Sequence, residues 1–112
     1  MKKIYSLIIA FVCFTGSLFA QSLLTEANEA YSNNDYAKAI QLYESVLKDE
    51  GKSATVYYNL GNAYYKNKQY APAILNYERA LLISPEKEDA RYNLEIARTH
   101  IVDKVDTVEP FF

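Results

Sequence analysis

The residues best suited to acid–base chemistry or metal binding lie toward the C-terminal end of the chain. His100 is the only histidine, and Glu86, Glu88 and Asp89 form the densest acidic group. Their positions favour structural roles, because a histidine near the end of a helix and acidic residues near the start of one both complement the helix dipole. The sequence also has no glycine-rich phosphate loop or nucleophile elbow. We predict a non-enzymatic chain with no catalytic residue, no metal site and no cofactor.

A second set of side chains, amides and tyrosines, is suited to holding a peptide. Asn59 and Asn62 are three residues apart, while Tyr58 and Tyr65 lie within one helical turn of Asn62 on either side. Amide groups both donate and accept hydrogen bonds, and tyrosines supply apolar contact area at little entropic cost. The pattern predicts a helix face that binds a peptide or protein partner. The alternative is a hydrated polar face without a partner.

Length and charge narrow the possible functions. The chain has 112 residues, which is room for one small domain, and 50% of them are hydrophobic, so a folded core is expected rather than disorder. The formal net charge of -2 argues against nucleic-acid binding, because that function requires a basic surface to neutralise phosphates.

The N-terminal residues are typical of an export signal. A positive start, "MKK", precedes the apolar run "IYSLIIAFVCF", and "TGSLFA" ends in a small residue. We predict that residues 1–20 are a signal peptide cleaved after Ala20, which places the domain in the periplasm or cell envelope. The alternative is an uncleaved N-terminal anchor. Cys13, the only cysteine, lies inside this segment, so the exported chain would have no thiol for a disulfide or a metal.

The remaining chain repeats itself. When the sequence is shifted by 34 positions, "NNDYAKAIQLYESVL" aligns with "NKQYAPAILNYERAL", and a second shift aligns "YYNLGNAY" with "RYNLEIAR". A unit of this length accommodates two helices and two turns, and each pair must stack on a neighbour to bury its apolar face. Hydrophobic spacing, Pro72 and the candidate caps Asn34 and Asp35 predict helices near residues 22–33, 36–49, 54–67, 70–83 and 87–101.

The second unit resembles the tetratricopeptide repeat. Its signature places are occupied by Tyr57, Leu60, Gly61, Tyr64, Ala73, Tyr77, Ala80 and Pro85. The first unit matches less well, because Glu26 replaces the usual leucine. The third contributes only its first helix, in which Leu94 matches and Glu95 replaces the glycine. The six tyrosines predicted to pack between helices are Tyr36, Tyr43, Tyr57, Tyr64, Tyr70 and Tyr77.

The resemblance implies an all-α fold, a tetratricopeptide helix-turn-helix solenoid with two repeats and a C-terminal capping helix. The domain would cover residues 21–101, followed by a tail or linker at 102–112. In such arrays the first helix of each pair lines a groove that binds a protein or peptide. The positions that match this groove are Asn28, Tyr31, Tyr58, Asn59, Asn62, Tyr65, Lys66, Tyr92 and Asn93.

One variant of this groove clamps a free C-terminal carboxylate. Its asparagines match Asn28 and Asn59, but its cationic places are occupied by Leu24, Asp89 and Asn93. Without those cations the carboxylate lacks its charge-assisted partners, so we expect no clamp of this type.

The junctions "YYNLGNAYYK", "AILNYERAL" and "RYNLEIARTHIVDKVDTVEPFF" resemble a narrower family, the tetratricopeptide proteins of Bacteroides aerotolerance (Bat) operons, the BatE family. This resemblance implies an envelope scaffold whose partners include the von Willebrand factor A-type membrane proteins of the same operon. Members of that family continue into membrane-spanning helices, so membrane association here would need the uncleaved N-terminus or a C-terminal extension. The alternative function is a structural homo-oligomer that assembles through its end helices without a peptide ligand.

Overall fold

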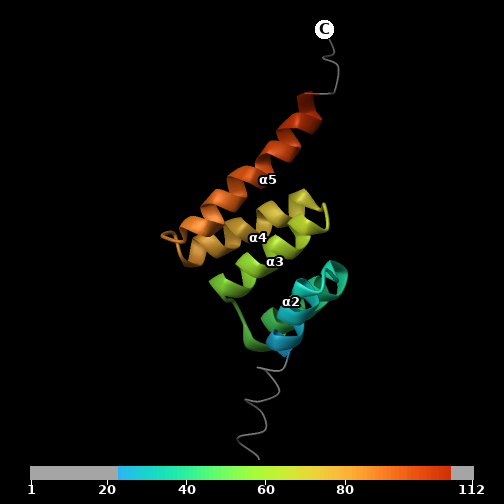
Figure 1. Ribbon diagram of the computed structural model, residues 1–112. Helices are drawn as coiled ribbons and strands as arrows, with labels where there is room; N and C mark the ends of the chain where they lie inside the picture. Colours follow the sequence, from blue (N-terminus) through green and yellow to red (C-terminus); the bar gives the residue numbers. More distant parts are fainter. Residues whose placement is uncertain (1–22, 107–112) are drawn as a thin grey trace, which may run out of the picture.

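The computed structural model describes residues 23–106, which form a series of antiparallel helices that runs from the bottom to the top of Figure 1. An N-terminal helix described over residues 23–32 is followed by α2 (Tyr36–Glu50), α3 (Ala54–Lys66), α4 (Tyr70–Ile83) and α5 (Glu88–Asp106). Helix α3 packs against α2 on one side and α4 on the other, and α4 packs against α5. The predicted all-α repeat architecture is confirmed. The predicted signal peptide, with Cys13, and residues 107–112 of the predicted tail lie outside the described residues.

Local sequence explains where the helices begin. The Asp35 carboxylate accepts a hydrogen bond from the Lys38 backbone N–H at 3.3 Å, and the Ser53 hydroxyl accepts one from the Val56 N–H at 3.3 Å. Each side chain therefore satisfies an N–H that has no partner inside its helix. Pro72 lies in the first turn of α4, where its missing N–H costs nothing.

The N-terminal helix with α2 forms the first helical pair, and α3 with α4 forms the second. The turns inside these two pairs have the same backbone conformation. Asn34 and Lys68 occupy equivalent places and both have positive φ, 64° and 62° respectively. Asparagine tolerates this left-handed conformation better than lysine does. Gly51, with φ of 93°, ends α2 and donates its N–H to the Leu47 carbonyl oxygen at 2.9 Å.

The predicted end of the last helix is wrong. Helix α5 continues to Asp106 rather than ending near residue 101, because no proline or glycine interrupts the sequence there. Of the helices within residues 23–106, none has the length and apolar character needed to cross a bilayer.

Tyrosines and small residues form the core between paired helices. Tyr43 and Tyr77 are almost fully buried, and a Cβ atom added at Gly61 would lie 2.7 Å from the ring of Tyr77. Glycine is therefore required for the close approach of α3 and α4. The other four tyrosines predicted to pack between helices, Tyr36, Tyr57, Tyr64 and Tyr70, are half-buried.

Candidate functional site

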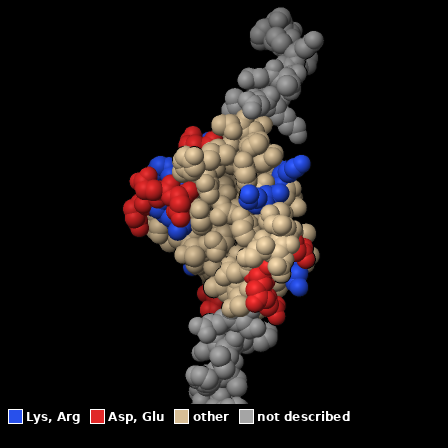
Figure 2. Space-filling model, in the orientation of Figure 1, with Lys and Arg blue, Asp and Glu red and all other residues tan. Residues whose placement is uncertain are grey.

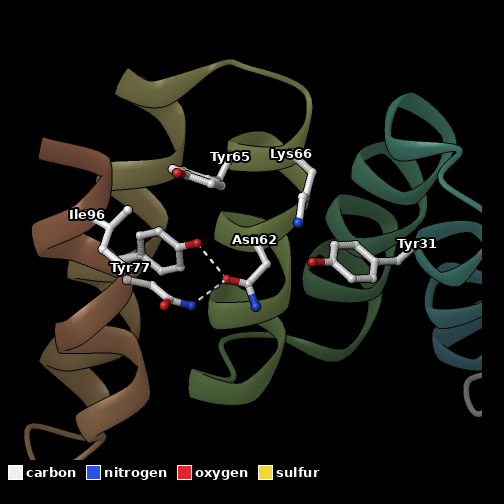
Figure 3. A pocket seen from close by; sticks show the side chains of 7 residues that line it. Tyr31, Asn62, Tyr65, Lys66, Tyr77 and Ile96 are labelled. Atoms are coloured by element: carbon white, nitrogen blue, oxygen red, sulfur yellow. Dashed lines mark hydrogen bonds between the residues drawn. The ribbon is translucent and has the colours of Figure 1, made fainter. Parts of the chain in front are cut away.

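A pocket of about 210 Å³ lies where the N-terminal helix, α3, α4 and α5 meet (Figure 3). Asn62, Tyr65 and Lys66 share one face of α3, because they are spaced by three and four residues. Asn93 and Ile96 project into the pocket from α5 in the same way. Its lining is Tyr31, Asn62, Tyr65, Lys66, Tyr77, Asn93 and Ile96.

Asn62 is held in place by two donors. Its Oδ1 atom accepts a hydrogen bond from the Tyr77 hydroxyl at 2.5 Å and another from Asn93 Nδ2 at 3.0 Å. Burial, followed by the neighbouring tyrosines, raises the pKa of Tyr77 well above its usual value of 10.0. The hydroxyl is therefore protonated at neutral pH and remains a donor to Asn62.

The first helical pair contains the same arrangement. The Tyr43 hydroxyl donates to Asn28 Oδ1 at 2.5 Å, and both residues lie 34 positions before Tyr77 and Asn62. Burial is the main cause that raises the pKa of Tyr43 to about 12. Asn28 and Asn62 are thus each anchored by the buried tyrosine of their own pair.

Tyr58 does not line the pocket but contacts the lining residue Asn93. Asn93 Nδ2 donates to the Tyr58 hydroxyl at 3.1 Å, and Lys87 Nζ lies 4.8 Å from the centre of the Tyr58 ring. A cation over an aromatic face is attracted by the ring quadrupole. Lys87 also pairs with Asp89 at 3.6 Å, so the acidic residue in the first turn of α5 has a structural partner.

The interpretation of His100 as a helix-terminal residue is wrong. Because α5 continues past it, His100 is half-buried and its ring stacks on Tyr70, with centroids 4.0 Å apart and planes 3° from parallel. Its Nε2 atom lies 3.0 Å from the Tyr65 hydroxyl. The histidine therefore joins α5 to the α3–α4 pair. Within the described part of the chain, no group of histidine, cysteine and acidic residues is arranged to hold a metal ion.

Charge is distributed unevenly over the domain. In the view of Figure 2, acidic side chains gather over the first helical pair and, mixed with basic ones, over the α4–α5 turn, with largely uncharged surface between the two groups. The pocket lining contains one cation, Lys66, and no carboxylate. Tyr31 faces Lys66 across this pocket, and burial raises the pKa of its hydroxyl. The pocket is therefore rich in hydrogen-bond donors.

The predicted groove residues fall into three groups. Tyr31, Asn62, Tyr65, Lys66 and Asn93 line the pocket together. Asn28 and Tyr58 do not line it; Asn28 is hydrogen-bonded to Tyr43 and lines a separate surface depression, and Tyr58 is hydrogen-bonded to Asn93. Asn59 is half-buried on α3 and Tyr92 is 69% exposed on α5, and neither lines the pocket.

Sequence reasoning missed two pocket residues. Ile96 is apolar, so its residue type did not mark it as a groove residue. It nevertheless lies 34 positions after Asn62, in the equivalent place of the next unit. Tyr77 was predicted only to pack, yet its hydroxyl reaches the pocket. The signal that reveals this role is the matched spacing of Asn28 to Tyr43 and Asn62 to Tyr77.

Comparisons with known proteins agree with this architecture. The family model described as tetratricopeptide repeat matches residues 24–94. The TPR domain of Sgt2 from Aspergillus fumigatus superposes with a TM-score of 0.70 at 28% identity, over 75% of this chain and 56% of that one. The Arabidopsis OM64 TPR domain gives a TM-score of 0.71 at 25% identity, over 75% of this chain and 69% of that one.

The chain thus spans just over half the length of the Sgt2 domain structure. No curated protein sequence matches it. The family model covers well over half of the chain and every helical pair described above. The protein belongs to the tetratricopeptide repeat family, whose domains are non-catalytic modules that mediate protein–protein interaction.

Proposed function

We propose that the pocket and the helix faces beside it bind an extended segment of a protein partner. The observation that carries this proposal is the convergence of tyrosine and asparagine side chains from four helices on one donor-rich pocket. Tyr31, Tyr65 and Tyr77 offer apolar area, and Asn62 and Asn93 offer polar groups already held by neighbours. Side chains ordered before binding lose less entropy when a partner arrives.

We further propose that this module acts as an exported scaffold of the cell envelope. The signal-like residues 1–20 and the resemblance of the junction sequences to Bat operon proteins support this location. The partner would then be a von Willebrand factor A-type membrane protein. Cell fractionation and mass spectrometry of the mature N-terminus test the location, and a chain that retains residues 1–20 in the cytoplasm would contradict it.

Site-specific cross-linking tests the binding face. A photo-reactive benzoylphenylalanine at Lys66 reports on the pocket, whereas the same group at Lys68 reports on the exposed turn two residues away. We expect a cross-link to one protein partner from position 66 and none from position 68. Equal labelling from both positions, or none from either, would overturn the groove proposal.

The same experiment separates binding from self-assembly. A structural homo-oligomer would cross-link to a second copy of this chain, and light scattering would show a mass that rises with concentration. A monomer at every concentration, combined with a cross-link to a different protein, supports the binding module.

A further inference from the structure

A second depression lies on the side of α3 opposite to the pocket. It opens where the ends of α2 and α4 meet the start of α3, and its volume of about 640 Å³ is within the range of ligand clefts. On α3, Asn62 and Lys66 lie roughly 140° and 180° around the helix from Tyr57, which lines this α2–α4 depression. Its lining shares no residue with that of the pocket and consists of Glu44, Leu47, Lys48, Lys52, Tyr57, Leu60, Arg79, Leu82 and Ile83.

Apolar side chains form the floor and one wall of the α2–α4 depression. Leu60 is buried and Leu47 and Tyr57 are half-buried, so these three form the floor. The wall from α4 is open to solvent, because Leu82 is 83% exposed and Ile83 is 46% exposed. Side chains this exposed gain little from folding, and exposed apolar residues that adjoin an apolar depression are typical of interaction sites.

The repeat does not require apolar residues at these two places. Leu82 and Ile83 lie 34 positions after Lys48 and Asp49, which are exposed in the first helical pair. Charged residues therefore suit the same places in the fold. The apolar wall is a property of the second pair alone, and folding does not explain it.

Three cations line the α2–α4 depression beside the apolar wall. They are Lys48, Lys52 and Arg79, and the lining includes one carboxylate, Glu44, which already accepts a hydrogen bond from the Tyr64 hydroxyl. Among the side chains that the structure describes, the ion pairs involve none of these three cations. This is unusual for a chain in which acidic residues outnumber basic ones, 14 against 12.

We propose that the α2–α4 depression is a second docking surface, which takes a protein segment that carries large apolar side chains next to acidic ones. The apolar side chains of the segment would cover Leu82 and Ile83, and its carboxylates would meet the unpaired cations. The Arg79 guanidinium lies 5.9 Å from the centre of the Tyr57 ring, which holds it beside the floor. This surface adds to the function proposed above, because it can be occupied while the pocket holds another segment.

An anionic lipid surface fits the α2–α4 depression less well than a protein segment does. Glu86, Glu88 and Asp89 follow directly after Ile83, in the α4–α5 turn and the first turn of α5. A membrane that covered the apolar wall would bring anionic headgroups close to these carboxylates, which they would repel.

Titration of the full chain with short peptides in low salt, followed by NMR, tests this docking. Acetyl-Glu-Leu-Phe-Glu-amide carries both features, acetyl-Gln-Leu-Phe-Gln-amide lacks the charges, and acetyl-Glu-Ala-Ala-Glu-amide lacks the large apolar groups. We expect saturable shifts of the Leu82 and Ile83 methyl signals, with Kd higher by about ten-fold for the alanine peptide and about three-fold for the glutamine peptide. Equal binding of all three, or shifts confined to Asn62 and Lys66, would overturn the proposal.

Two variants with matched controls separate the apolar wall from the cations. Leu82→Lys introduces the residue of the first pair and should abolish most of the binding, whereas Leu75→Lys, on α4 but outside the depression, should not. Lys48→Gln should reduce the preference for the acidic peptide, and Lys68→Gln should leave it unchanged. Because Leu82 is exposed, helical content should be retained in Leu82→Lys, and unchanged binding in that variant would contradict the proposal.

Two other occupants of the surface have distinct results. Co-sedimentation with phosphatidylglycerol vesicles that is lost in Leu82→Lys would assign the surface to a membrane and overturn the proposal. A dimer in light scattering that Leu82→Lys dissociates would assign it to a second copy of this chain, with the same consequence. Cross-linking from position 66 tests the pocket separately, so the function proposed above and this inference can each fail without the other.

Discussion

The two helical pairs share one set of tyrosine and asparagine contacts and differ in the contacts that hold each pair together. The Asn28–Tyr43 bond and the Asn62–Tyr77 bond are equivalent and have equal lengths of 2.5 Å. The adjoining aromatic pairs also agree: Tyr31 and Tyr36 have ring centroids 5.5 Å apart at 66°, and their equivalents in the second pair are 5.5 Å apart at 67°.

The supporting contacts do not repeat in this way. Ala27 stands where the second pair has Gly61, and Leu42 stands where it has Asn76. The first pair has a side-chain cap at Asp35, whereas Gln69, at the start of α4, makes none. The two pairs thus share the geometry of these tyrosine and asparagine contacts while their packing and capping residues differ.

The largest expected effect tests the tighter packing of the second pair. Gly61→Ala places a Cβ atom 2.7 Å from the buried ring of Tyr77. Overpacking of this kind costs about 1 to 3 kcal/mol, while alanine returns about 1 kcal/mol of helix propensity. We expect urea denaturation to show a net loss of up to about 2 kcal/mol.

The control for Gly61→Ala is its mirror image, Ala27→Gly. Removing a methyl group from the first pair should destabilise through propensity and a small cavity, without any clash. If Gly61→Ala proved more stable than the wild type, the ring of Tyr77 would have room to move, and the proposed difference between the pairs would disappear.

The capping difference predicts an effect of about 1 kcal/mol. Asp35→Ala removes the acceptor of the Lys38 N–H, and loss of such a cap typically costs about this much. Asp35→Asn keeps a capping oxygen and should remain close to the wild type. Thermal unfolding followed by circular dichroism would measure both, and equal loss in the two variants would show that charge rather than capping is responsible.

Substitution of Asn76 should change the stability by a smaller amount, and in the stabilising direction. Asn76 is 3% exposed, its Nδ2 donates to the Pro72 carbonyl at 2.8 Å, and its Oδ1 has no partner within the described residues. Asn76→Leu introduces the residue of the first pair. We expect a gain of about 0.5 to 1 kcal/mol, since the cost of the unpartnered oxygen exceeds the value of one hydrogen bond.

The reverse substitution in the first pair, Leu42→Asn, is the matched variant. Urea denaturation would measure the stability of both Asn76→Leu and Leu42→Asn. The second variant should lose stability, because the amide enters an apolar position of the first pair. A loss in both variants would mean that the buried amide of Asn76 is satisfied by ordered water.

Local signals in the sequence predicted most of the fold. Helix boundaries followed from the Asp35 cap, from Pro72 and from the helical spacing of apolar residues, and these depend on neighbours within one or two turns. The end of α5 was not predicted, because the absence of a helix breaker after residue 101 is a weaker signal than a proline or a glycine.

The pocket was predicted less completely, for a physical reason. Its hydrogen bonds join residues 15 to 35 positions apart, such as Tyr77 to Asn62 and Asn93 to Tyr58, and their formation depends on how the helices pack. The stacking of His100 on Tyr70 has the same origin. Helical periodicity places a residue on a face, but only packing decides whether that face meets a neighbour.

The smallest expected effect compares the two junctions between units. Glu44 accepts a hydrogen bond from the Tyr64 hydroxyl at 2.5 Å, while the equivalent Glu78 pairs with Arg98 at 3.1 Å. Glu44→Gln and Glu78→Gln should each cost about 0.5 kcal/mol or less in low salt, because both contacts are exposed. Urea denaturation in 1 M NaCl should abolish the effect of Glu78→Gln, since salt screens ion pairs, and leave that of Glu44→Gln.

The stability at high pH gives a second way to distinguish the same two junctions. Burial, together with the bond to Glu44, raises the pKa of Tyr64 from 10.0 to about 12. Because the folded state favours the protonated hydroxyl, this contribution is intact below pH 10 and is lost as the pH rises through about 12. We therefore expect Tyr64→Phe to lose less stability than the wild type between pH 10 and 12. Glu78→Gln should lose as much as the wild type. Parallel curves of stability against pH for all three proteins would show that the tyrosine bond does not link α2 to α3.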